Sequence, residues 1–96
     1  MSFQVLIKRK SVEAIHELPE KTRRIIHDTL KSLEQDPYLG GGGDKELLHH
    51  EEGIEIYRLH IGRSYTAFYT IDKPIRVVKV HDIMTIEQAH RKYGRI

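Results

Sequence analysis

The segment from Ile54 to Ile71 constrains the fold of this chain most strongly, because it has the pattern of two β-strands joined by a tight turn at residues 62–64. Successive side chains of a strand point to opposite faces. One face of the first strand then carries Tyr57, Leu59 and Ile61, and the other carries Arg58 and His60. Residues 65–71 are again rich in aromatic and β-branched side chains, which suit a half-buried sheet. We therefore expect a β-hairpin with one core face and one face available for chemistry.

The composition suits one compact domain that spans residues 1–96, since 39% of the residues are hydrophobic. The chain has no cysteine, which excludes disulfides, thiolate zinc sites and cysteine nucleophiles and favours a reducing cytoplasm. No apolar run approaches the roughly 20 residues of a membrane helix, and no apolar signal-peptide core follows Lys8-Arg9-Lys10. We expect a soluble, cytoplasmic protein without a membrane partner.

Charge is distributed unevenly along the chain. Residues 1–55 hold 8 Lys and Arg against 11 Asp and Glu, a formal −3, and residues 56–96 hold 8 against 3, a formal +5. The basic half also contains His60, His81 and His90, which add positive charge on mild acidification. This asymmetry favours an anionic partner, most simply nucleic acid, and an ordinary basic surface is the alternative.

The first part of the chain predicts a strand followed by two helices. Residues 3–8 alternate between apolar and polar side chains, as a strand does. Ser11 is a candidate N-cap for the first helix, and Pro19 suits the first turn of a second helix from Glu20 to about Gln35. Asp36-Pro37 ends this helix. Both helices carry an apolar stripe, so we expect a helical hairpin that a sheet covers.

Two segments before the hairpin resemble binding motifs only superficially. Gly40–Gly43 lacks the Gly-Lys-Ser/Thr of a phosphate-binding loop, and we expect a flexible loop. In the acidic segment from Asp44 to Glu55, His49-His50-Glu51-Glu52 contains residue types that bind divalent metals. Neighbouring side chains of an extended chain point apart, however, and the helical H-E-x-x-H spacing is absent from the sequence. We expect a solvated loop and no metal site.

The C-terminal part predicts one more strand and a short helix. Residues 72–74 supply a turn, and Ile75 to Val80 form a strand of β-branched character. Thr85 and Gln88 fit a capping box that starts the last helix. The predicted order is β-α-α-β-β-β-α. This is an α+β fold with a small antiparallel sheet, an N-terminal helical hairpin packed on it and a short C-terminal helix.

The hairpin also carries a family resemblance. Residues 57–62, Tyr-Arg-Leu-His-Ile-Gly, followed by Tyr65 and Tyr69, resemble the Y-R-x-R-x-G-x-Y-R-x-x-Y signature of the RelE/ParE toxin superfamily. The resemblance spans nearly the whole chain and implies the toxin of a toxin–antitoxin pair. RelE-like members cleave messenger RNA in the ribosomal A site without a metal, and ParE-like members inhibit DNA gyrase.

The chain departs from the RelE pattern at several positions. RelE-like enzymes usually carry a basic residue at the position of His60 and arginine at the position of Thr66. One extra residue stands between Gly62 and Tyr65. Near the C-terminus the family tyrosine matches Tyr93, and its basic companions match only loosely. An arginine of the family site is therefore missing.

The chemistry that the resemblance implies assigns roles to five side chains. RNA cleavage by the 2′-hydroxyl requires a base, a cation for the extra negative charge on phosphorus and an acid for the leaving 5′-oxygen. His60 is the candidate base and Arg58 the candidate phosphate ligand, with a solvent-facing structural role as the alternative for both. His81 is a candidate acid or second cation, or simply a strand-end residue. Arg91 is a candidate further contact, and Tyr93 is expected to stack on a base.

Two function classes remain open. The first is a metal-independent endoribonuclease that cleaves messenger RNA on the ribosome and inhibits translation. The second is a non-nucleolytic protein, either a ParE-like gyrase inhibitor or a weakened toxin that mainly binds an antitoxin, and Thr66 favours it. Both imply a cognate antitoxin, expected to be a short, acidic, helical protein, and neither implies a small-molecule cofactor.

Overall fold

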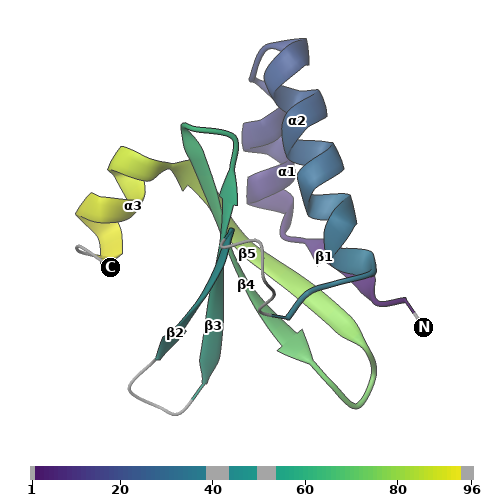
Figure 1. The fold of residues 1–96 in the computed structure, drawn as a ribbon. Helices are drawn as coiled ribbons and strands as arrows, with labels where there is room; N and C mark the ends of the chain where they lie inside the picture. The colour runs from purple at the N-terminus through teal and green to yellow at the C-terminus, as the bar shows by residue number, and fades with distance from the viewer. Residues whose placement is uncertain (1, 39–43, 50–53, 94–96) are drawn as a thin grey trace.

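The computed structural model describes residues 2–38, 44–49 and 54–93, and within them it forms an α+β fold (Figure 1). The elements are β1 Gln4–Ile7, α1 Arg9–His16, α2 Glu20–Lys31, the 3-10 helix η1 Ser32–Glu34, β2 Lys45–His49, β3 Glu55–Ile61, β4 Tyr65–Asp72, β5 Val77–Thr85 and α3 Ile86–Tyr93. The predicted fold class, with a helical hairpin followed by a sheet and a last helix, is confirmed.

The strands form one five-stranded sheet in the order β1-β5-β4-β3-β2. Strands β2 to β5 are antiparallel to their neighbours, whereas β1 runs parallel to β5. The sheet is therefore mixed, whereas the sequence predicted an antiparallel sheet. A parallel pair needs a long crossover connection between its strands. Here the helical hairpin, η1 and strands β2 to β4 lie between β1 and β5 in sequence.

Strand β2 is an addition to the predicted order. It lies in the acidic segment, where we expected a loop, and it pairs along β3 with Leu47 opposite Tyr57 and Leu48 opposite Ile56. Lys45 has a side chain only 8% exposed, and its ammonium group lies 3.7 Å from Asp44 and 3.8 Å from Asp36. Charged side chains are common on edge strands, and here they gave the segment the composition of a loop.

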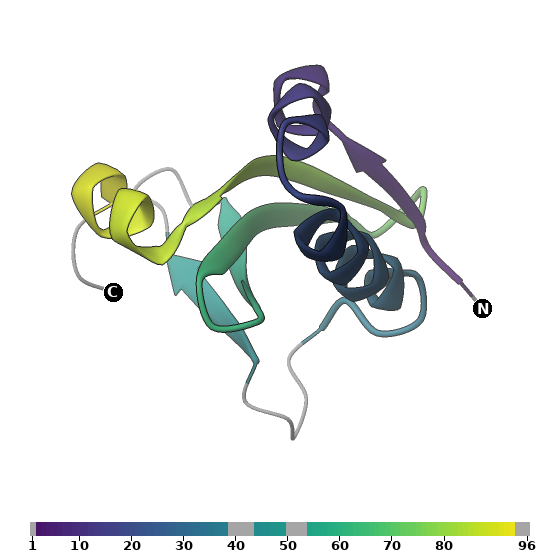
Figure 2. The same ribbon diagram turned by 90° about the horizontal axis from the view of Figure 1, so that it is seen from above.

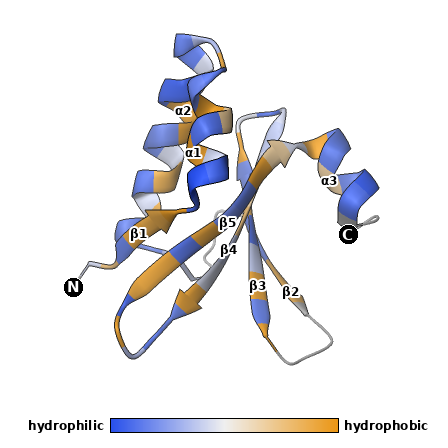
Figure 3. Cartoon of the chain, turned by 180° about the vertical axis from the view of Figure 1, so that it is seen from behind, coloured by the Kyte–Doolittle hydropathy of each residue, from blue (hydrophilic) through white to orange (hydrophobic). Residues whose placement is uncertain are grey.

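The core lies between the helical hairpin and one face of the sheet. Figures 1 and 2 show α1 and α2 together on one side and α3 apart from them, beside the other end of the sheet. The buried cluster consists of Phe3, Ile26, Leu30, Leu33, Tyr57, Leu59, Ile61, Ala67, Tyr69, Val78 and Val80. Figure 3 shows the hydrophobic and hydrophilic sides of α1 and α2 that this packing requires. The predicted core face of the hairpin is confirmed.

Helix α1 and strand β5 have boundaries that differ from the sequence prediction. Helix α1 begins at Arg9, so Ser11 does not cap it but lies buried inside it and donates from Oγ to the carbonyl of His81 at 3.4 Å. Strand β5 begins at Val77, after Arg76 with φ 53°, and extends to Thr85. The capping box is confirmed, since the Thr85 amide donates to Gln88 Oε1 at 3.0 Å and the Gln88 amide to Thr85 Oγ1 at 3.1 Å.

Tyr69 connects the centre of the sheet to the end of the helical hairpin. Its ring stacks on Tyr57 with centroids 5.3 Å apart, and its hydroxyl donates to the carbonyl of Pro37 at 2.7 Å. Burial, and next the neighbouring Tyr57, raise the pKa of Tyr69 well above the ordinary value. The hydroxyl therefore stays protonated, as a donor must, and fixes the chain where it leaves the hairpin.

We expect Tyr69→Phe to lower the free energy of unfolding by about 1–3 kcal/mol, because it leaves a buried carbonyl without its donor. Urea denaturation of both proteins measures the difference. Tyr65→Phe, which removes a hydroxyl from the same face of β4, is the matched control and should change stability by less than about 0.5 kcal/mol. Equal losses in the two variants would contradict this role of the Pro37 contact.

Candidate active site

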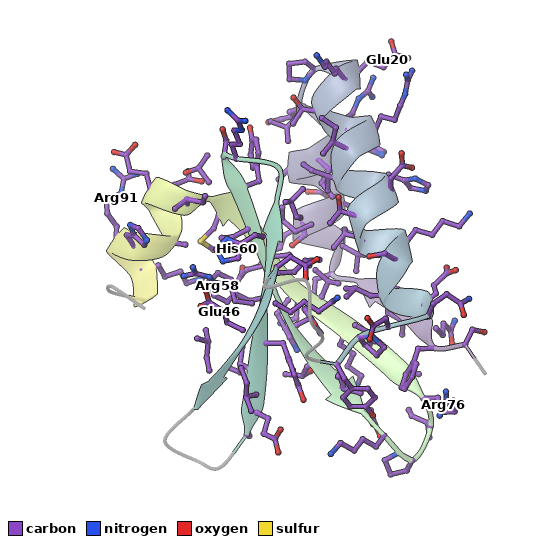
Figure 4. The ribbon with its side chains drawn as sticks, viewed as in Figure 1. Glu20, Glu46, Arg58, His60, Arg76 and Arg91 are labelled. Atoms are coloured by element: carbon purple, nitrogen blue, oxygen red, sulfur yellow. The ribbon has the colours of Figure 1, made fainter. Side chains whose placement is uncertain are left out.

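The polar face of β3 brings a base, a cation and a carboxylate together. Arg58 and His60 share this face because they are two residues apart on one strand, and Glu46 on β2 stands directly opposite Arg58. Arg58 Nη2 lies 3.2 Å from His60 Nε2, and Glu46 Oε1 lies 3.2 Å from His60 Nε2 and 3.6 Å from Arg58 Nη2. Figure 4 shows the three side chains together on the side of the strands that faces α3.

Arg58 is buried, although it lies on the face away from the core. Its residue exposure is 6%, and across the sheet its register neighbours are Phe68 and then Asp82. Helix α3 packs on β4 and β5 beside this row and buries Ala89. Within the described residues, Nε and Nη1 of Arg58 have no hydrogen-bond partner. A permanent cation is therefore held in a largely dry place with incomplete pairing, which is costly for stability.

His60 is placed for proton transfer. Its side chain is 29% exposed, so solvent or a ligand can reach the ring. Nε2 cannot accept a hydrogen bond from Arg58 and donate one to Glu46 at the same time. In the neutral ring with the proton on Nδ1, Nε2 accepts from Arg58, and with a proton on Nε2 the ring donates to Glu46. Nε2 therefore has Arg58 as a donor when it carries no proton and Glu46 as an acceptor when it carries one.

Thr66 occupies the place next to His60 on the adjoining strand. It pairs with His60 across β3 and β4, is 1% exposed, and donates from Oγ1 to the carbonyl of Leu59 at 3.1 Å. This is the position at which the family signature has an arginine. The positive charge that this arginine would supply is therefore absent directly beside the candidate base His60.

His81 lies apart from Arg58 and His60. It belongs to β5, and β4 separates that strand from β3. It is the extra residue where the register shifts, since Tyr69 pairs with Val80 and Phe68 pairs with Asp82. Its Nε2 lies 2.8 Å from the hydroxyl of Thr70.

The surroundings of His81 also oppose a role as an acid. Burial, and next the positive charge of Lys8, lower the pKa of His81 below the ordinary value of 6.5, and Lys79 adds to this. The nearby Asp82 acts in the opposite direction but does not reverse the shift. His81 is therefore mainly neutral at neutral pH, whereas a general acid needs its proton.

The other predicted residues lie on α3 and in the acidic segment. Arg91 is exposed on the outer side of α3, 3.9 Å from Glu87 (Figure 4). Tyr93 ends α3, and its side chain lies outside the described part of the structure, as do the side chain of His49 and all of residues 50–52. The predictions for Tyr93 and for the absence of a metal at 49–52 therefore stay predictions.

Glu46 is the residue of this site that the sequence analysis did not identify. The segment around it gave no strand signal, so its position opposite Arg58 was not evident. Residues 45–49, Lys-Glu-Leu-Leu-His, show no alternation of apolar and polar side chains, so the sequence offers no signal for this strand. Its register against β3 comes only from the structure.

Comparison with solved structures identifies the fold. One chain of the archaeal RelE–RelB complex from Pyrococcus horikoshii OT3 superimposes with a TM-score of 0.74 at 24% identity, covering 88% of this chain and 96% of that one. The chain has the RelE toxin fold. A chain of the RelBE2 toxin–antitoxin complex from Mycobacterium tuberculosis gives a TM-score of 0.71 at 16% identity, covering 88% of this chain and 99% of that one.

A chain of the YoeB–YefM complex from Staphylococcus aureus gives 0.64 at 20% identity and covers 86% of this chain and 95% of that one. No family model and no curated protein matches the sequence. The RelE resemblance expected from the hairpin is thus confirmed at the level of the RelE fold. Within the described residues, no helix is long and apolar enough to span a membrane.

We expect His81 to make the protein less stable in mild acid. Because the folded state lowers the pKa of His81, the unfolded chain binds a proton first as the pH falls below about 6.5, and stability decreases through that range. His81→Gln should therefore show a smaller drop in melting temperature between about pH 7.5 and about pH 5.5 than the unmodified protein. His27→Gln, on the exposed surface of α2, is the control. An unchanged drop in His81→Gln would contradict the assignment.

Proposed function

We propose that this protein is the toxin of a toxin–antitoxin pair and that it acts as a metal-independent endoribonuclease on messenger RNA at the ribosome. The observation that supports this most directly is Arg58, a buried and incompletely paired arginine in contact with a partly exposed histidine on the face of the sheet away from the core. Burying such a group costs the folded protein stability. Retained buried charges are expected at sites of function, where the fold accepts a local cost.

The chemistry follows from these two side chains. His60 takes the proton from a ribose 2′-hydroxyl, and the resulting oxygen attacks the neighbouring phosphorus. Arg58 binds the phosphate oxygens and stabilises the additional negative charge as the P–O bond to the 2′-oxygen forms and the P–O bond to the 5′-oxygen breaks. The products are a 2′,3′-cyclic phosphate and a 5′-hydroxyl, whose oxygen requires a proton.

The remaining predicted residues have supporting parts in this proposal. Arg91 contacts a phosphate of the message from the exposed side of α3, and Tyr93 stacks on a base. His81 stabilises the bulge of β5 and supplies no proton, in line with its position and lowered pKa. The acid for the 5′-oxygen is then water or a group of the ribosome.

The proposal includes a cytoplasmic location and a cognate antitoxin. The solved structures with this fold include complexes named RelE–RelB, RelBE2 and YoeB–YefM. The excess of positive charge in residues 56–96 suits an acidic partner. A neighbouring reading frame for a short, acidic, helical protein that abolishes toxicity when co-expressed would support this part of the proposal.

We expect Arg58→Ala and His60→Ala each to reduce cleavage of ribosome-bound message by about 10²- to 10⁴-fold, because one removes the phosphate ligand and the other the base. Primer extension on messages translated by purified ribosomes measures the cleavage, and growth of expressing cells measures the toxicity. Arg24→Ala and His27→Ala, both exposed on α2, are the matched controls. Full activity in both site variants would refute the proposed mechanism.

A second function has one specific observation in its favour. Thr66 is buried and hydrogen-bonded at the place of the missing arginine, so this site has fewer cations than the family signature provides. A non-nucleolytic protein, either a gyrase inhibitor or a weakened toxin that mainly binds its antitoxin, is therefore the alternative. Message cleavage mapped to the ribosomal A site excludes it, whereas growth arrest with intact messages and normal translation supports it.

A further inference from the structure

The charges around Arg58 nearly cancel before any ligand binds. Arg58 contributes one positive charge, and Glu46 places a carboxylate oxygen 3.6 Å from it. His60 adds positive charge only when protonated, and Thr66 adds none. An anion that approaches this face therefore meets a cation that is already partly neutralised by a side chain of the protein itself.

The contact between Glu46 and Arg58 has the geometry of a replaceable partner. A tight arginine–carboxylate pair is bidentate and shorter than 3 Å, whereas Glu46 makes one longer contact and leaves Nε and Nη1 of Arg58 unpaired among the described residues. Glu46 stands on the edge strand β2, and its side chain is 41% exposed. It can rotate into solvent without disturbing the core.

We propose that Glu46 is an internal competitor of the substrate phosphate: its carboxylate occupies the place near Arg58 and His60 that an RNA phosphate takes, and it weakens RNA binding until it is displaced. The identity of the ligand rests on the proposed function, but the competition itself does not require cleavage.

Competition follows from the geometry of the shared atoms. Glu46 Oε1 lies 3.6 Å from Arg58 Nη2 and 3.2 Å from His60 Nε2, and the proposed mechanism assigns both side chains to the RNA. A phosphate oxygen bound to Arg58 would lie close to the carboxylate, and two negative groups at that distance repel. Phosphate binding therefore requires the Glu46 carboxylate to move away from Arg58 and His60. The free energy of these contacts is lost, which weakens the binding of RNA by the same amount.

The test is the affinity for a short single-stranded RNA that carries 2′-O-methyl groups and cannot be cleaved. Fluorescence anisotropy at one fixed, low salt concentration measures it for the unmodified protein and for Glu46→Gln, which keeps the shape of the side chain and removes its charge. We expect Glu46→Gln to bind about three- to tenfold more tightly. Glu13→Gln, the same charge change at an exposed position of α1, controls for net charge and should change affinity by less than about twofold.

A double-mutant cycle locates the effect. In an Arg58→Ala background, Glu46→Gln should gain no more affinity than Glu13→Gln does, because no buried cation is left to release. Thermal melts of each variant verify that it is folded. Unchanged, weaker or undetectable binding by folded Glu46→Gln would overturn the inference, as would an equal gain in the Arg58→Ala background.

The two proposals fail separately. If Glu46→Gln binds the oligonucleotide more tightly but neither protein cleaves ribosome-bound message, the competition stands and the ribonuclease function fails. If the unmodified protein cleaves and Glu46→Gln shows no gain in binding, the ribonuclease function stands and the competition fails.

Discussion

The structure depends on the alternation of side chains along β3. Tyr57, Leu59 and Ile61 pack against α2 and its neighbours on one face, while Arg58 and His60 lie on the other. A shift of one residue in register would exchange the two sets and bury both polar groups in the core. The pairing of β3 with β4 and the burial of the apolar set therefore fix the site at the same time as they fix the fold.

Most of the fold could be predicted because its strongest elements carry local signals. The hairpin, the two apolar stripes and the capping box at Thr85 are recognised from residue spacings of two, three or four, and the structure confirms them. Strand β2 and the C-terminal half of β5 were missed for a common reason. Their own residues, such as Glu46 and Asp82, have low strand propensity, so no local pattern marks them as strands.

The site could be predicted only in part, for the same physical reason. Arg58 and His60 are two residues apart on one strand, so their proximity follows from strand geometry alone. The contact of Glu46 depends on the register between β2 and β3, and the separation of His81 depends on β4 and on the register shift beside it. Both are properties of strand pairing across the sheet, which residue patterns within one strand do not specify.

In the proposed mechanism, the balance of charge around Arg58 connects the stability of the fold with phosphate binding. Glu46 places a carboxylate oxygen 3.6 Å from the buried guanidinium, and a buried charge without an opposite charge is strongly destabilising. In this proposal Glu46 stabilises the folded protein and leaves Arg58 less free to bind a phosphate. Thr66 stands where the family signature has an arginine, so the proposed site lacks a second permanent cation. Phosphate binding in this proposal therefore depends more strongly on Arg58. A RelE fold with this arrangement should bind anions more weakly than one with two arginines, and the half-exposed position of Glu46 sets how much of that affinity is recovered.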